Sequence, residues 1–224
     1  MEKKKVIVVG GGIIGLATAY YLDLEGHDVS IIDKDYRGKF VDLGCFHPTR
    51  SNNTFKLYKK GWTGVNIDLN PLTIDLFNYA RPKDINICTA VSDKKTNKKL
   101  YFLGDLDSKN TLNLNHKKWI NKHFRIEDKD FKIKNISTQK LENILKKYKL
   151  YNIDFMNIDI EGHELEVIKS INFKKFKIKV ICVEILDYNK FAKSRKKQLI
   201  SYLKKNNFKL FGKSTINYIF IHNT

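Results

Sequence analysis

Acidic residues stand at or near the ends of short apolar stretches in this chain, and their positions point to a shared site. The set comprises Asp42, Asp68, Asp159, Glu161 and Glu184. In an open parallel sheet the carboxyl ends of the strands meet at one rim, where ligands bind. A carboxylate after the second strand suits the two hydroxyls of a ribose, and a glycine such as Gly44 lets the backbone approach a ligand. We predict a functional cleft at this rim, although any single acid could instead be a turn residue or face a helix dipole.

The apolar stretches alternate with helical patterns, which is typical of an α/β fold with a mostly parallel sheet. After a first strand that ends near Asp42, strands are expected at 64–68, 85–91, 100–103, 154–159 and 179–185, with a closing antiparallel pair at 208–211 and 218–221. Helices are expected at about 51–60, 72–80, 162–170 and 192–206. A further helix should follow Thr138, which we expect to cap it, because Leu141, Ile144, Leu145 and Tyr148 recur at helical spacing.

Residues 104–136 show no clean period, and we expect them to be irregular. A stretch this long inside a compact domain is more often functional than idle, so it is interpreted as a variable, substrate-facing insertion. Its basic residues are suited to an anionic acceptor; they are Lys117, Lys118, Lys122, His123 and Arg125. The alternative is an exposed loop with a lysine-rich surface.

The first 37 residues form a separate pattern. A strand at 6–9, a glycine turn at 10–15, a helix at 16–24 and a strand at 29–33 give G-x-G-x-x-G with an acid about 20 residues on. This segment resembles the opening βαβ unit of FAD-dependent amino-acid-oxidase-type oxidoreductases. The resemblance implies FAD or NAD at Gly10, Gly12, Gly15 and Asp33, or else a fused remnant that binds nothing. We therefore divide the chain into an extension, 1–37, and a domain, 38–224.

The composition limits the class of protein. With 224 residues, 42% of them hydrophobic and 29% charged, the domain can bury a full core. The net charge of +18 favours an anionic membrane surface or a phosphorylated or glycolipid acceptor, unless it is only a lysine bias. No basic block matches a nucleic-acid recognition module, so no nucleic-acid partner is expected. Three dispersed cysteines indicate a reducing, cytoplasmic setting, and no run approaches the ~18 apolar residues of a membrane span.

From about Gly38 to the C-terminus the chain resembles the FkbM-type methyltransferases. The segments that carry the resemblance are Phe40-Val-Asp-Leu-Gly-Cys-Phe-His-Pro48, Ser51-Asn-Asn-Thr54, Lys60-Gly-Trp-Thr-Gly-Val-Asn-Ile-Asp-Leu-Asn-Pro71, Ala90-Val-Ser-Asp93 and Ile153-Asp-Phe-Met-Asn-Ile-Asp-Ile-Glu-Gly-His-Glu164. It implies a class I, Rossmann-like fold whose last strand is antiparallel. It also implies S-adenosylmethionine-dependent O-methylation of a sugar hydroxyl in polysaccharide or glycoconjugate biosynthesis.

The resemblance assigns roles to residues of this sequence. Asp42 and Gly44 would line the methionine end of the cofactor, and Asp68 would hold the ribose hydroxyls. Asp159 would stand near the methyl group. The remaining implied cofactor-binding residues are Asn53 and Asn70, with Ala90, Val91 and Ser92 beside the adenine.

Methyl transfer from a sulfonium needs mainly in-line positioning, and a base helps when the acceptor is a hydroxyl. The catalytic candidates are Asp159, Glu161 and His163, the last because its ordinary pKa suits proton transfer near neutral pH. No metal ligands are assigned, but a divalent cation held by Asp159, Glu161 and Glu184 is an alternative. Two other functions stay open, an FAD- or NAD-linked oxidoreductase fragment and a non-catalytic binding module on the same fold.

Overall fold

The computed structural model describes residues 4–9, 13–32 and 36–223. Within these ranges the largest sheet has seven strands. Their order across the sheet is β11 (Phe208–Lys213), β12 (Asn217–His222), β10 (Lys177–Glu184), β9 (Asn152–Ile158), β3 (Lys39–Leu43), β4 (Thr63–Asp68) and β5 (Ile85–Cys88). Pairing is parallel from β10 to β5, whereas β12 is antiparallel to both of its neighbours. The predicted α/β fold with an antiparallel last strand is confirmed.

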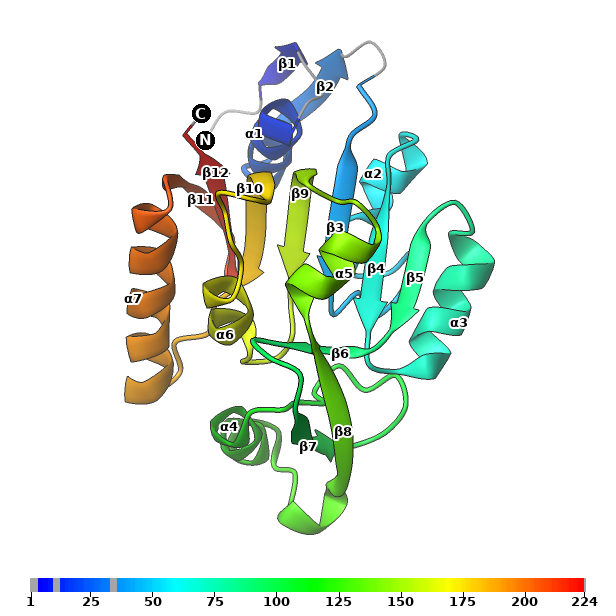
Figure 1. The fold of residues 1–224 in the computed structure, drawn as a ribbon. Coiled ribbons are helices and arrows are strands. Elements are labelled where there is room, and N and C mark those ends of the chain that lie inside the picture. The colour runs from blue at the N-terminus through cyan, green and yellow to red at the C-terminus, as the bar shows by residue number, and fades with distance from the viewer. Residues whose placement is uncertain (1–3, 10–12, 33–35, 224) are drawn as a thin grey trace.

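Helices cover both faces of this sheet (Figure 1). One face packs on α5 (Leu141–Lys147), α6 (Glu164–Lys169) and α7 (Lys190–Lys205). The other face meets α1 (Ile13–Leu24) and α2 (Phe55–Lys59). Strand β10 is continuously buried from Val180 to Glu184, as expected of a parallel strand covered on both sides. At the edge of the sheet, α3 (Pro71–Ala80) begins with a proline, which suits the first position of a helix. Asn70 caps this helix, because its side chain accepts a hydrogen bond from the backbone N–H of Leu72 at 3.0 Å.

A smaller sheet lies beyond the carboxyl ends of the parallel strands (Figure 1). It contains β6 (Ala90–Ser92), β8 (Lys132–Lys140) and β7 (Asn97–Phe102), in that order. Between β7 and β8 come α4 (Leu114–Phe124) and a 3₁₀ turn, η1 (Asp128–Asp130). The prediction that residues 104–136 are irregular is therefore wrong. The expected strand at 85–91 is two strands, β5 and β6, in different sheets.

The N-terminal unit lies at the opposite end of the molecule from β7, β8 and α4 (Figure 1). Strands β1 (Lys5–Val9) and β2 (Asp28–Ile32) pair in parallel on either side of α1 in the chain. The ring of Tyr21 in α1 packs at 6.4 Å from that of Phe211. Of the predicted dinucleotide residues, Gly15 is in α1, while Gly10, Gly12 and Asp33 lie outside the described residues. No helix within the described ranges is both long and apolar enough to cross a membrane.

Asp154 ties the entry of β3 to β9 and β10. Its carboxylate accepts hydrogen bonds from the backbone N–H of Lys39 at 2.8 Å and from the hydroxyl of Tyr36, and it pairs with Lys179 at 2.7 Å. Burial raises the pKa of Asp154, but the bonds from Lys179, Tyr36 and Lys39 outweigh burial and hold that pKa below its usual range. The ionised carboxylate therefore stabilises the folded state.

Asp154→Asn is expected to lower the free energy of unfolding at pH 7 by about 1–3 kcal/mol. Because the folded-state pKa is depressed, the stabilisation is present above the unfolded pKa and is lost as the pH falls below about 4. Urea titrations of the wild type and of Asp154→Asn should show a smaller difference in the free energy of unfolding at pH 3.5 than at pH 7. Asp187→Asn, which removes an exposed pair with Lys196, should change little at either pH, and an equal loss there would contradict the prediction.

Candidate functional site

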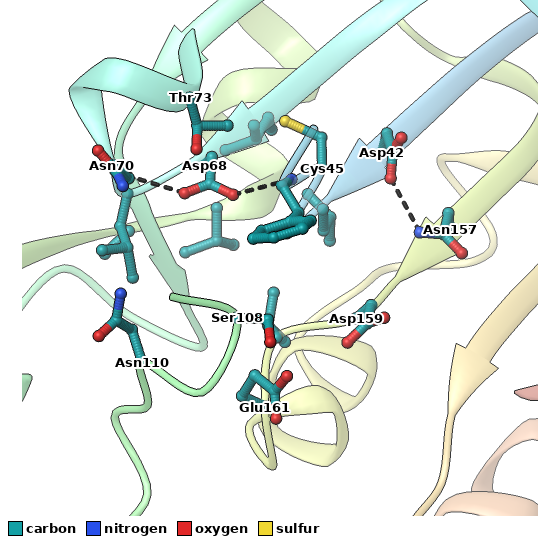
Figure 2. A pocket seen from close by; sticks show the side chains of 18 of the residues that line it. Asp42, Cys45, Asp68, Asn70, Thr73, Ser108, Asn110, Asn157, Asp159 and Glu161 are labelled. Carbon is teal, nitrogen blue, oxygen red and sulfur yellow. Dashed lines mark hydrogen bonds between the residues drawn. The ribbon is translucent and has the colours of Figure 1, made fainter. Parts of the chain in front are cut away.

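A cavity of about 350 Å³ opens at the carboxyl ends of β3, β4 and β9 (Figure 2). This is where strand order reverses, since β3 pairs with β4 on one side and with β9 on the other. Its volume lies within the range of small-molecule sites. The predicted site residues that line it are Asp42, Gly44, Asn53, Asp68, Asn70, Ala90, Val91, Asp159, Glu161 and His163. Ser92 and Glu184 are not among its lining residues.

Asp68 is fixed by two backbone donors on one side of the cavity (Figure 2). Its Oδ2 accepts from the N–H of Phe46 at 3.1 Å, and its Oδ1 accepts from the N–H of Asn70 at 2.9 Å. Burial raises the pKa of Asp68, and these two bonds oppose that rise. Each carboxylate oxygen can accept a further hydrogen bond, so the side chain is held in place and can still bind a ligand.

Gly44 lies where the backbone of β3 passes that of the segment after β9. Its φ is +72°, and a Cβ at this position would stand 1.7 Å from the carbonyl oxygen of Asp159. The Asp159 N–H donates to the carbonyl of Leu43 at 3.0 Å, which holds the two segments together. A glycine is therefore required here by both conformation and space.

Asp42 is fully buried and already paired by side chains around it. Its Oδ1 accepts from Asn157 at 2.8 Å, and its Oδ2 accepts from Thr54 at 2.8 Å and from Asn52 at 3.1 Å. Burial raises the pKa of Asp42, and these three donors lower it. Asn157 was not predicted, although a polar residue within the apolar run of β9 was a usable signal. Its Oδ1 accepts from Asn53 at 2.9 Å, which fixes another lining residue.

Asp159, Glu161 and Glu184 each offer a carboxylate oxygen within 4.8 Å of the others. Asp159 and Glu161 line the cavity across from Asp68 (Figure 2). Burial raises the pKa of all three groups, and repulsion from the neighbouring carboxylates adds to the rise for Asp159 and Glu184. Glu184 is buried and the other two are partly buried, and three like charges at this spacing are costly unless a proton or a cation is shared among them.

The turn that presents Glu161 is clamped from two directions. Glu161 and Gly162 both have left-handed backbones, with φ of +54° and +90°. The Glu164 carboxylate accepts from the N–H of Gly162 at 2.9 Å and of Ile160 at 3.2 Å, and burial raises the pKa of Glu164 to about 7. From the other side, the segment before α4 donates to this turn: Thr111 bonds the carbonyl of Glu161 at 2.7 Å and Asn113 that of Gly162 at 2.6 Å.

The same contacts bring His116 of α4 against the turn. A Cβ on Gly162 would lie 3.1 Å from the Cβ of His116, so only glycine leaves ordinary room for this approach. His116 is 1% exposed, and its Nε2 stands 2.9 Å from Oε2 of Glu161. Burial lowers the pKa of His116 to about 4, so the imidazole is neutral at pH 7. His116 could not be predicted as a site residue, because only long-range contacts bring it to the turn.

His163 is buried at the edge of the cavity, with both ring nitrogens near partners. Its Nε2 lies 2.9 Å from the hydroxyl of Ser92, and its Nδ1 lies 3.5 Å from Glu166. Glu166 in turn accepts from Arg195 at 2.6 Å. Burial lowers the pKa of His163, so the ring is neutral at pH 7. Ser92 therefore does not line the cavity itself, but its hydroxyl orients the ring of His163, which does.

The stretch 104–136 contributes to the cavity, but not through the basic residues named above. Its lining residues are Leu106, Asp107, Ser108, Asn110 and Leu112. Lys117 is buried and pairs with Asp128, so it is not available to an anionic acceptor. The other four basic side chains are exposed, namely Lys118, Lys122, His123 and Arg125.

Comparison with known proteins separates the two parts of the chain. The family model described as "Methyltransferase FkbM domain" matches residues 42–210, and that described as "NAD(P)-binding Rossmann-like domain" matches residues 8–37. The first match begins within β3 and ends within β11, and it covers every residue that lines the large cavity.

Curated relatives match shorter stretches. The "Uncharacterized protein in nifH2 3'region" of Methanothermococcus thermolithotrophicus is 39% identical over 87 residues, which is 34% of this chain and 70% of that protein. D-amino acid dehydrogenase 1 of Mesorhizobium japonicum is 32% identical over 72 residues, 30% of this chain and 15% of the enzyme. D-amino acid dehydrogenase of Vibrio atlanticus is 56% identical over 36 residues, 16% of this chain and 9% of the enzyme. The chain thus spans only a small part of either dehydrogenase.

The match over 42–210 takes in most of the chain, including strands β4, β5, β9 and β10 of the large sheet and the cavity that is the candidate site. The chain belongs to the methyltransferase FkbM domain family.

Proposed function

We propose that this protein transfers the methyl group of S-adenosylmethionine to a hydroxyl oxygen, with a sugar as the acceptor. The observation that carries the proposal is the arrangement of the cavity: Asp68 and Gly44 both line it, and Asp159 and Glu161 line it across from Asp68. We assign the part beside Asp68 and Gly44 to the nucleoside and its chain, and the part beside Asp159 and Glu161 to the reacting groups. The family match supports methyl transfer in general, and the choice of cofactor and acceptor is our inference from this arrangement.

In the proposed reaction the acceptor oxygen attacks the methyl carbon in line with the carbon–sulfur bond. The bonding pair of that bond goes to sulfur, which leaves as S-adenosylhomocysteine. The hydroxyl proton passes to one of the three predicted bases, Asp159, Glu161 or His163, all of which line the cavity. The rise in the pKa of the two acids makes each a stronger base than an exposed carboxylate.

A sugar acceptor fits the polar residues that the loop after β7 adds to the cavity lining. Ser108 and Asn110, both from the loop after β7, line the cavity, and Ser108 stands next to Glu161 (Figure 2). Hydroxyl and amide groups of this kind form the hydrogen bonds that orient polyhydroxyl ligands. In this proposal the N-terminal unit takes no part in the reaction, because it lies at the opposite end of the sheet (Figure 1).

Calorimetric titration with S-adenosylmethionine, S-adenosylhomocysteine, FAD and NAD tests the proposal. We expect the first two to bind, and Asp68→Ala to weaken them about 10- to 100-fold, since it removes charge-assisted hydrogen bonds to the ribose. Asp75→Ala, an exposed acid on α3, serves as the control and should bind normally. Binding of FAD or NAD alone would overturn the proposal in favour of an oxidoreductase fragment. Tight binding without methyl transfer to any sugar tested would indicate a binding module.

A further inference from the structure

The carboxylate cluster and His116 together have the composition of a cation site. His116 is 1% exposed, and neither of its ring nitrogens forms a hydrogen bond within the described part of the chain. Its Nε2 nevertheless stands 2.9 Å from Oε2 of Glu161. A buried imidazole that faces a carboxylate at this distance without a hydrogen bond is an unusual arrangement. It would be explained by an ion that both atoms bind.

The distances fit one ion. In an octahedral site with bonds of ~2.1 Å, neighbouring ligand atoms stand ~3.0 Å apart and opposite atoms ~4.2 Å apart. The 2.9 Å between His116 and Glu161 matches a neighbouring pair. The carboxylate oxygens of Asp159, Glu161 and Glu184 lie within 4.8 Å of one another, which a small adjustment brings into the same range.

The location also leaves room for an ion and for water molecules that would complete its coordination. Asp159 and Glu161 line the large cavity, whereas Glu184 and His116 line an adjoining one of about 40 Å³. The cluster therefore lies between the two cavities. This smaller space exceeds the ~10–15 Å³ needed for one water. An ion here would reach whatever occupies the outer part of the large cavity.

We propose that Asp159, Glu161, Glu184 and the Nε2 of His116 bind one divalent cation of the Mg²⁺ or Mn²⁺ class. Three oxygen ligands select a hard cation, and the single imidazole suits Mn²⁺ as well. A cation bound there would coordinate the acceptor hydroxyl and lower its pKa. This catalytic role rests on the methyl transfer proposed above, but the binding of the ion does not.

The test is a titration of the whole, EDTA-treated chain with Mn²⁺, followed by the loss of the free-ion electron paramagnetic resonance signal, with Mg²⁺ as competitor. We expect one Mn²⁺ per chain, and at least tenfold weaker binding in Glu184→Gln and in His116→Ala. Glu127→Gln, an exposed acid, should bind like the wild type. Because Glu184 does not line the large cavity, Glu184→Gln should keep its affinity for S-adenosylmethionine.

Circular dichroism and the unfolding midpoint show whether each variant folds. If His116→Ala does not fold, the Mn²⁺ affinity of Glu184→Gln alone tests the proposal. The proposal is overturned if the wild type binds no Mn²⁺ or Mg²⁺ at millimolar concentration, or if a folded variant binds as tightly as the wild type. Mn²⁺ binding without S-adenosylmethionine binding would instead sink the proposed function and leave the cation site standing. Binding of S-adenosylmethionine without binding of Mn²⁺ would overturn the cation site and leave the proposed function standing.

Discussion

Arg81→Met is expected to lower the free energy of unfolding by about 3–5 kcal/mol. Arg81 and Asp84 form an ion pair at 2.8 Å in which both side chains are 0% exposed. Removing the guanidinium leaves the Asp84 carboxylate buried and without its counter-charge, and this costs more than the pair itself contributes. Urea denaturation monitored by tryptophan fluorescence measures the change. Arg50→Met, at an exposed position, is the matched control and should shift stability by less than about 0.5 kcal/mol.

The loss should extend to ligand binding, because Arg81 also supports the cavity wall. Its Nη1 donates to Asn52 at 3.1 Å and to Thr54 at 3.0 Å, and both of these side chains donate to Asp42. The double variant Arg81→Met with Asp84→Asn removes both charges and keeps an oxygen that can accept from the N–H of Gly64, so it should recover part of the lost stability. If the double variant is as unstable as Arg81→Met alone, the buried uncompensated charge is not the cause.

The strand-end acids could be predicted from the sequence because their position follows from topology alone. Parallel strands bring their carboxyl ends to one rim, so Asp42, Asp68 and Asp159 had to lie near one another once the strands were recognised. The structure places all three around one cavity. The strands themselves were recognisable because apolar runs bounded by turn residues are a local signal.

The helix α4 could not be predicted, because its buried face does not carry the apolar residues that give a helical period. The buried residues of α4 are His116, Lys117 and Ile120, and two of these three are polar or charged. Lys117 is buried beside the rings of Tyr101 and Phe131 and pairs with Asp128, which only the folded chain brings together. A search for hydrophobic periodicity cannot find such a face.

Thr138 shows a related limit. It was expected to cap the following helix, but it belongs to β8, and its hydroxyl donates to the carbonyls of Lys94 and Thr96 at 2.9 Å. Helix α5 instead begins after Lys140, which provides no side-chain cap. A threonine before a helical pattern fits a cap and a strand equally well, and the choice here depends on pairing with the distant β6.

Gly44→Ala is expected to destabilise the domain by about 2–5 kcal/mol and to weaken S-adenosylmethionine binding at least tenfold. The first part of the cost is conformational, since a left-handed backbone with a Cβ costs ~1–2 kcal/mol. The second part is steric: the new Cβ would stand 1.7 Å from the carbonyl oxygen of Asp159, and overpacking of this kind costs ~1–3 kcal/mol. Urea titration and calorimetry measure the two effects on the same protein.

Two other glycines separate these contributions. Gly61 has a φ of +84°, but its nearest neighbour is the flexible side chain of Arg37 at 3.4 Å, so Gly61→Ala should carry only the conformational cost. Gly104 has open space around it and no left-handed backbone, so Gly104→Ala should be nearly neutral. If Gly44→Ala costs no more than Gly61→Ala, the contact with Asp159 is not tight. In that case Gly44 does not determine the position of Asp159, which is both a proposed base and a proposed cation ligand.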